Sequence, residues 1–171
     1  MSGNYFELFE LPVSLRVDKK LAHQRFIALS KKYHPDYFAQ EGADKQAEML
    51  DVSANLNKGL KIFQREDETI KYVLQWKGLL EEEEKYDLPP AFLMEVLEIN
   101  EQLMDADDDS GKAAIEQLID NLQKEIYEPV KDIVEGYQEG VTTKEELLQV
   151  KAYYYKKKYL DRIRRQLAGN A

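Results

Sequence analysis

The stretch KYHPDY, residues 32–37, interrupts a helical pattern with a histidine, a proline and an aspartate. Proline fixes its own φ, lacks a backbone donor and disfavours the helical conformation of the residue before it. We therefore expect a helix to end near His34, with the His34 and Asp36 side chains held on a rigid corner. Such a corner could be half of a metal site, an acid–base pair, a helix stop or a surface recognised by another protein.

The sequence on both sides of this corner predicts helices, because apolar residues recur at spacings of three and four. Asn4, with Glu7 three positions later, is a candidate cap for a short first helix, and Asp18 for the second. The second and third helices each carry an apolar stripe, namely Ala22, Phe26, Leu29 and Tyr33, then Met49, Val52, Leu56 and Phe63.

A change of pattern occurs at EEEEKYDLPP, residues 81–90, where four glutamates are followed by paired prolines. We predict a first domain over 1–78, a linker over 79–90 and a second domain over 91–171. Short turns between the long helices of the second half favour an antiparallel three-helix bundle. The predicted fold class is therefore all-α, in two domains.

Two local sequence signals predict where helices of the second domain end or begin. Pro129 should kink or interrupt the middle helix of the predicted bundle, because its ring cannot continue a regular helix. Thr142 with Glu145, or Thr143 with Glu146, can form a capping box that begins the last helix. The apolar stripe predicted for that last helix is Leu148, Ala152, Tyr155, Tyr159 and Ile163.

Composition excludes several classes of protein. The 171 residues carry a net charge of −9 and contain no apolar run long enough to span a bilayer, which argues against nucleic-acid and membrane partners. The first residues lack the order of a signal peptide, so we expect a soluble, cytoplasmic protein. With no cysteine, disulfides, thiolate catalysis and thiolate metal ligation are excluded.

Charge is unevenly distributed along the chain. Between Arg16 and Lys32 six basic residues accompany a single acidic one, Asp18. Between Glu81 and Glu146, by contrast, 21 acidic residues accompany five basic ones. Two surfaces of opposite sign favour two different partners.

Neither a metal site nor an acid–base active site at the corner has the further residues that it would need. A zinc site needs at least three protein ligands, and His23 lies eleven residues before His34, or roughly 16 Å along the same helix. An acid–base enzyme would need a nucleophile or a substrate pocket, yet no glycine-rich loop or nucleophile elbow is present. We therefore expect no metal, no cofactor and no enzymatic activity. A helix stop and a protein-docking surface remain, and the basic helix next to the corner favours docking.

The order of these elements resembles a J-domain: NYFELFEL, a basic amphipathic helix, YHPDYF and an apolar helix. That family activates the ATPase of seventy-kilodalton heat-shock chaperones. Over essentially its full length the chain resembles the HscB type, the J-protein co-chaperone of iron–sulfur cluster assembly. The supporting stretches are YFELFELP, KYHPDYFA, SANLNKGLKIF and LPPAFLMEVLE.

The resemblance implies a J-domain, built as a helical hairpin with a His-Pro-Asp loop, followed by a scaffold-binding three-helix bundle. It implies two partners, a heat-shock-type chaperone ATPase and an iron–sulfur cluster scaffold protein; the alternative is a J-domain co-chaperone for a different client. Together with the charge pattern, it assigns chaperone docking to His34, Pro35, Asp36, Lys20, Arg25, Lys31 and Lys32.

Some residues depart from the family pattern. Gly59 and Leu60 stand where a small residue and an aromatic are usual, and the glycine should weaken the third helix locally. The outward face of the second helix carries Gln24 and Ile27 as well as lysines, so it is only partly basic. Without cysteines the chain is poorly equipped to hold a cluster, which by resemblance sits on a separate scaffold.

The stretch AFLMEVLEINEQLM, residues 91–104, predicts a helix that is apolar on two faces. One face carries Phe92, Val96, Ile99 and Leu103, all within about 60°, and is the expected core stripe. The other face is either buried against another element or an exposed patch with an acidic rim. By resemblance it binds the scaffold, through Leu93, Met94, Leu97, Glu98 and Glu101, with Tyr159 from the last helix.

Overall fold

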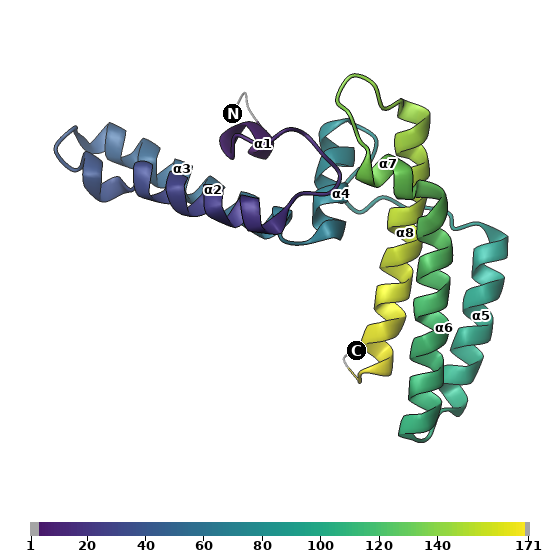
Figure 1. Ribbon diagram of the computed structural model, residues 1–171. Helices are drawn as coiled ribbons and strands as arrows, with labels where there is room; N and C mark the ends of the chain where they lie inside the picture. The colour runs from purple at the N-terminus through teal and green to yellow at the C-terminus, as the bar shows by residue number, and fades with distance from the viewer. Residues whose placement is uncertain (1–3, 170–171) are drawn as a thin grey trace. The chain divides into compact units, whose positions relative to one another are not determined.

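The computed structural model describes residues 4–169, and every regular element within them is helical (Figure 1). The all-α prediction is thereby confirmed. The chain separates into two compact units, Met1–Val73 with Tyr137–Glu139, and Leu74–Gly136 with Gly140–Ala171. The domain bounds predicted from the sequence stay a prediction, and their first three and last two residues lie outside the described part.

The first unit is a helical hairpin with a short helix packed on it. Its elements are α1 (Tyr5–Leu8), α2 (Lys19–Lys32), η1 (Pro35–Phe38), α3 (Ala43–Phe63) and the beginning of α4 (Glu66–Trp76). Helices α2 and α3 pack side by side, and the 3₁₀ turn η1 lies at the tip that joins them (Figure 1). The predicted hairpin with the His-Pro-Asp sequence in its loop is confirmed.

Two predicted caps begin the helices of this unit. The Asn4 side chain accepts a hydrogen bond from the Glu7 backbone N–H at 2.9 Å. The Asp18 carboxylate accepts from the N–H groups of Lys20 and Leu21 at 2.9 and 3.1 Å. Each cap satisfies donors that have no partner within the helix, which explains why these helices start where they do.

An aromatic cluster fixes α1 on the hairpin. The Phe9 and Phe63 rings meet edge to face at 5.0 Å between centroids, and Phe6 and Phe63 at 4.9 Å. The Tyr5 backbone N–H donates to the Tyr72 hydroxyl at 3.0 Å, and burial raises the pKa of Tyr72 above its ordinary value. The short α1, too small to be stable alone, is thereby held by tertiary contacts.

The glycine that departs from the family pattern has a packing role. A Cβ added at Gly59 would lie 2.6 Å from the Phe9 ring and 3.2 Å from the Tyr5 ring. Only glycine lets the α3 backbone approach α1 this closely. The expected local weakness of the helix is therefore offset by a contact that the sequence did not reveal.

Gly59→Ala should lower the free energy of unfolding by about 1–2 kcal/mol. Alanine favours a helix over glycine by about 1 kcal/mol. The new methyl would lie 2.6 Å from the fully buried Phe9 ring, so we expect an overpacking cost of about 2–3 kcal/mol, the upper part of the usual range. Urea unfolding measures the change. Gly111→Ala in α6 is the control, because its nearest neighbours would lie 3.4 Å away and stability should not fall. A Gly59→Ala protein as stable as the parent would contradict the packing role.

The second unit is a three-helix bundle with a short additional helix. Its elements are α5 (Pro90–Asp105), α6 (Asp109–Tyr127), η2 (Glu128–Val130), α7 (Lys131–Glu135) and α8 (Lys144–Leu167). Helices α5, α6 and α8 pack against one another, as the sequence predicted. Pro129 also does what was predicted, because α6 ends at Tyr127 and the chain continues through η2 into α7.

Helix α8 begins with the second of the two predicted capping boxes. The Thr143 side chain accepts from the Glu146 N–H at 3.1 Å, and the Thr143 N–H donates to the Glu146 carboxylate at 3.0 Å. The apolar stripe predicted for α8 was partly wrong, because Leu148 is exposed whereas Leu147 and Val150 are buried. Helix α8 packs on α7 and η2 as well as on α5 and α6, so its buried face is not one continuous stripe.

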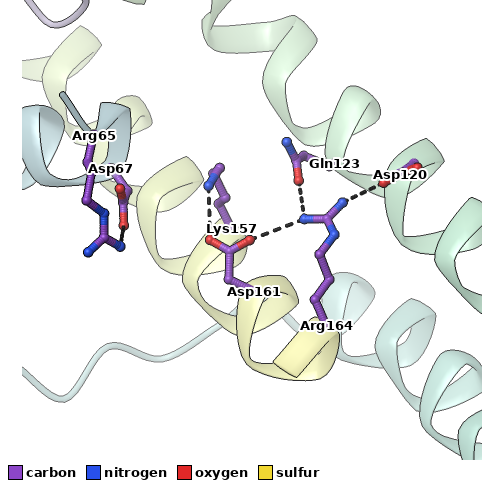
Figure 2. A network of polar contacts seen from close by, with 7 residues as sticks. All are labelled: Arg65, Asp67, Asp120, Gln123, Lys157, Asp161 and Arg164. Carbon is purple, nitrogen blue, oxygen red and sulfur yellow. Dashed lines mark hydrogen bonds and ion pairs between the residues drawn. The ribbon is translucent and has the colours of Figure 1, made fainter. Parts of the chain in front are cut away.

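The core of the bundle is a single cluster contributed by all three long helices. Its buried members are Phe92, Val96, Ile99, Ile115, Ile119, Leu122, Leu160 and Ile163. A polar network adds to this packing on the surface between α6 and α8 (Figure 2). Arg164 donates to Asp120 at 2.7 Å and to Gln123, and it also contacts Asp161, which accepts from Lys157 at 2.9 Å.

Candidate functional site

The His-Pro-Asp corner forms because α2 ends at Lys32, two residues before His34. The Tyr33 N–H still donates to the Leu29 carbonyl at 3.0 Å, but His34 is extended, with φ −63° and ψ 129°. Pro35 then occupies the first position of η1, where its missing donor leaves no bond unmade. The backbone at the corner is therefore fixed by proline and by the two helices that meet there.

The two polar side chains of the corner are exposed although their backbone is fixed. His34 Nδ1 accepts the Asp36 backbone N–H at 3.3 Å, and the two side chains approach to 3.7 Å. The side chains of His34 and Asp36 are 54% and 85% exposed. A neutral imidazole that accepts at Nδ1 carries its proton on Nε2, so the corner offers one donor and one carboxylate acceptor to a partner.

Tyr37 belongs to the same exposed surface and was missed in the sequence analysis. Its side chain is 72% exposed, and its ring meets the His34 ring edge to face at 6.0 Å. The Tyr37 N–H donates to the His34 carbonyl at 3.0 Å. The available signal was the tyrosine at the end of the KYHPDY stretch. It was missed because Tyr37 belongs to the apolar stripe of neither flanking helix.

The structure brings together only part of the predicted basic surface. Lys20 and Lys31 lie about 20° apart on α2 and are exposed together with Gln24 and Ile27. Arg25 lies about 140° from Lys20 and its guanidinium contacts Glu10 at 3.4 Å. The docking roles assigned to these cations stay a prediction. Lys20 and Lys31 are the two that lie on the same exposed face of α2.

The chemistry available at the corner is recognition by hydrogen bonds and charge. Within residues 4–169 no three histidine, aspartate or glutamate side chains gather closely enough to hold a metal ion. Because the backbone at the corner is already fixed, binding of a partner there costs less conformational entropy than binding to a flexible loop. The geometry thus suits a docking surface.

Helix α5 presents the second candidate site. Phe92, Val96 and Ile99 are buried on one face of this helix. On the opposite face Leu93, Met94 and Leu97 are 43%, 69% and 52% exposed. Within the second unit, therefore, no neighbouring helix buries these three side chains.

We call the exposed set Leu93, Met94, Leu97, Glu98 and Glu101 the α5 patch. The two glutamates are exposed and border the three apolar side chains. Tyr159, the remaining predicted contact, approaches α5 from its buried side, since its ring meets Phe92 edge to face at 6.3 Å. Tyr159 is half-buried, so the structure gives it a packing role alongside any contact with a partner.

Comparison with known proteins assigns the family. Residues 88–168 match the family described as the HSCB C-terminal oligomerisation domain. A co-chaperone protein HscB homolog of Haemophilus ducreyi is 30% identical over 158 residues, which cover 90% of this chain and 90% of the relative. This chain belongs to the HscB family of co-chaperones. A second HscB homolog, from Vibrio cholerae, is 26% identical over 171 residues, covering 97% and 99% of the two chains.

Solved HscB structures share the fold. The crystal structure of human co-chaperone protein HscB matches 98% of this chain and 81% of its own, with a TM-score of 0.80 and 25% identity. The chaperone HscB from Vibrio cholerae matches 96% and 99% of the two chains, with a TM-score of 0.64 and 25% identity. The predicted order of a J-domain followed by a C-terminal helical domain is confirmed.

Among the described residues, no helix combines the length and the apolar character that crossing a bilayer requires. The cytoplasmic location expected from the sequence stays a prediction.

Proposed function

We propose that this HscB-family protein binds an iron–sulfur cluster scaffold protein and brings it to a seventy-kilodalton heat-shock-type chaperone, whose ATPase it stimulates. The observation that carries the proposal is the corner of His34, Pro35 and Asp36, where two exposed polar side chains stand on a fixed backbone. Family membership supports the same assignment.

The exposed lysines of α2 and the corner have different roles in docking. Lys20 and Lys31 attract an acidic surface of the chaperone over about a Debye length, which raises the rate of encounter. His34 and Asp36 then make the short-range contacts, for which their fixed backbone lowers the entropic cost. ATP hydrolysis takes place in the chaperone, so this protein is not itself an enzyme and needs no cofactor.

The α5 patch is the proposed scaffold-binding surface. Leu93, Met94 and Leu97 supply adjacent apolar area, and a few such contacts commonly dominate the energy of an interface. Glu98 and Glu101 supply an acidic rim that selects a partner with complementary basic residues. The two proposed surfaces lie on different units, so one molecule has separate residues for each partner.

Steady-state ATPase measurements on the dedicated chaperone test the proposal. We expect this protein to raise the rate, and the scaffold to raise it further when both are present. An unchanged rate with this protein would contradict the chaperone role. Stimulation without any binding of the scaffold would instead favour the alternative, a J-domain co-chaperone for a different client.

Reversal of the paired lysines should weaken docking. We expect Lys20→Glu/Lys31→Glu to raise the concentration needed for half-maximal stimulation about tenfold at low salt, because two attractions become repulsions and each exposed pair contributes about 0.2–1 kcal/mol. Raising the salt concentration should also raise the concentration of the parent protein that is needed for half-maximal stimulation, because salt screens the same attractions.

The control is Lys58→Glu/Lys61→Glu on α3, which makes the same change of net charge at two exposed positions. This control should stimulate as the parent protein does. Equal loss in both double variants would mean that overall charge, and not the α2 surface, governs docking.

A further inference from the structure

The basic side chains of α8 fall into two sets that differ in their surroundings. One set is neutralised by nearby carboxylates: Lys151 by Glu84 at 2.8 Å, Lys157 by Asp161 at 2.9 Å and Arg164 by Asp120 at 2.7 Å. Figure 2 shows the last two of these pairs. Lys151 and Arg164 hold α8 to other parts of the second unit, whereas the Lys157–Asp161 pair lies within α8 itself.

The other set has no such compensation. Lys158, Arg162 and Arg165 follow one another at spacings of four and three, so they lie on one face of α8. With Lys85 they line a pocket of about 320 Å³. Among residues 4–169 none of these four cations has a carboxylate within ion-pair distance. We call this site the basic pocket.

Tyrosines and one leucine supply apolar surface to the basic pocket. The Tyr86 and Tyr155 rings stack in parallel, 4.5 Å apart with an interplanar angle of 4°. The Arg162 guanidinium lies over the Tyr159 ring at 5.1 Å, and Leu88 completes the apolar lining. The pocket therefore combines positive charge with aromatic and aliphatic surface.

The single carboxylate in the pocket lining is already engaged. Glu84 accepts hydrogen bonds from Lys151 at 2.9 Å and from the Tyr155 hydroxyl at 3.1 Å. The bond from Lys151 holds the pKa of Glu84 below its ordinary value, so this carboxylate is ionised and its charge is balanced by Lys151. The four cations of the basic pocket consequently remain as uncompensated positive charge.

Uncompensated cations around one pocket repel one another, and an anion bound between them would relieve that repulsion. The protein as a whole carries a net charge of −9, so this local excess of positive charge is opposite in sign to the rest of the chain. Arginines bind carboxylates through paired N–H donors, and tyrosine faces pack well against aromatic or apolar side chains. The lining thus matches a ligand that carries both carboxylates and an apolar group.

We propose that the basic pocket binds an acidic peptide segment of a partner protein, with an apolar or aromatic side chain of that segment against the tyrosines. The basic pocket shares no residue with the His-Pro-Asp corner or the α5 patch, although Tyr159, a predicted scaffold contact, is part of its lining. The proposal does not depend on the role of either of those surfaces.

Fluorescence anisotropy with the full chain tests this proposal. The probe is a labelled hexapeptide of five acidic residues and one phenylalanine, and its partner probe replaces each acid by the corresponding amide. We expect the acidic probe to bind at low salt at least tenfold more tightly than the amide probe. Arg162→Glu/Lys158→Glu should weaken its binding at least tenfold, and Arg162→Gln/Lys158→Gln should weaken it to a smaller extent.

The control is Lys112→Glu/Lys131→Glu, which places the same charge change at exposed positions outside the basic pocket. This control should bind the acidic probe like the parent protein. Equal binding of the two probes, or unchanged binding by both pocket variants, would overturn the proposal. Displacement of the probe by an equimolar amount of pyrophosphate would overturn it too, since the pocket would then be a site for small phosphates.

Discussion

Replacing His34 by glutamine should abolish stimulation of the chaperone's ATPase and leave the melting temperature nearly unchanged. The His34 side chain is 54% exposed, and the one backbone group that it binds, the Asp36 N–H, is itself at the surface. Exposed substitutions of this kind usually change stability by no more than about 0.5 kcal/mol. The loss of function would follow from removal of an imidazole whose position is fixed by Pro35.

The measurement is steady-state ATPase over a range of co-chaperone concentrations, together with thermal unfolding. The chain offers a matched control in His23→Gln, which makes the same chemical change at an exposed position on α2. This control should stimulate normally. A His34→Gln protein that unfolds, or one that stimulates fully, would rule out the docking role of the corner.

The double variant Leu93→Ala/Leu97→Ala should lose scaffold binding and still stimulate the chaperone by itself. Both leucines are exposed in the α5 patch, so folding should change little. Scaffold affinity should fall at least tenfold, because truncation of the few residues that dominate an interface costs about 2 kcal/mol or more. The J-domain is untouched, so stimulation in the absence of scaffold should be retained.

Ile99→Ala on the opposite face of α5 is the matched control. Ile99 is buried in the core cluster, and its truncation should lower stability by about 2–5 kcal/mol. Calorimetry and a binding assay on both variants separate the two faces of the helix. A large melting shift in the leucine double variant, with scaffold affinity retained, would show that the α5 patch is core and not interface.

Local signals in the sequence predicted much of the fold. The caps at Asn4 and Asp18, the corner at Pro35 and the interruption at Pro129 each depend on residues within a few positions of one another. Local preferences of this kind act whatever the tertiary fold, which is why these elements could be predicted from the sequence. The two faces of α5 were predicted for the same reason, since helical period alone separates Val96 from Leu97.

Other features depended on contacts between residues far apart in the chain. The stripe predicted for α8 treated the helix as if one partner covered it, whereas α5, α6, η2 and α7 all pack against it. The role of Gly59 became visible only with the Phe9 ring against it, fifty residues earlier in the chain. Neither contact leaves a signal in the local sequence.

The sequence by itself determined the all-α class, the His-Pro-Asp corner and the amphipathic period of α5, because each follows from short-range conformational preference. The tertiary structure alone determined which charges are compensated. Lys157 and Lys158 are adjacent and chemically identical, yet Lys157 pairs with Asp161 whereas Lys158 faces the basic pocket. Whether a charge is neutralised depends on which side chains other helices bring within a few ångströms, and packing sets those distances.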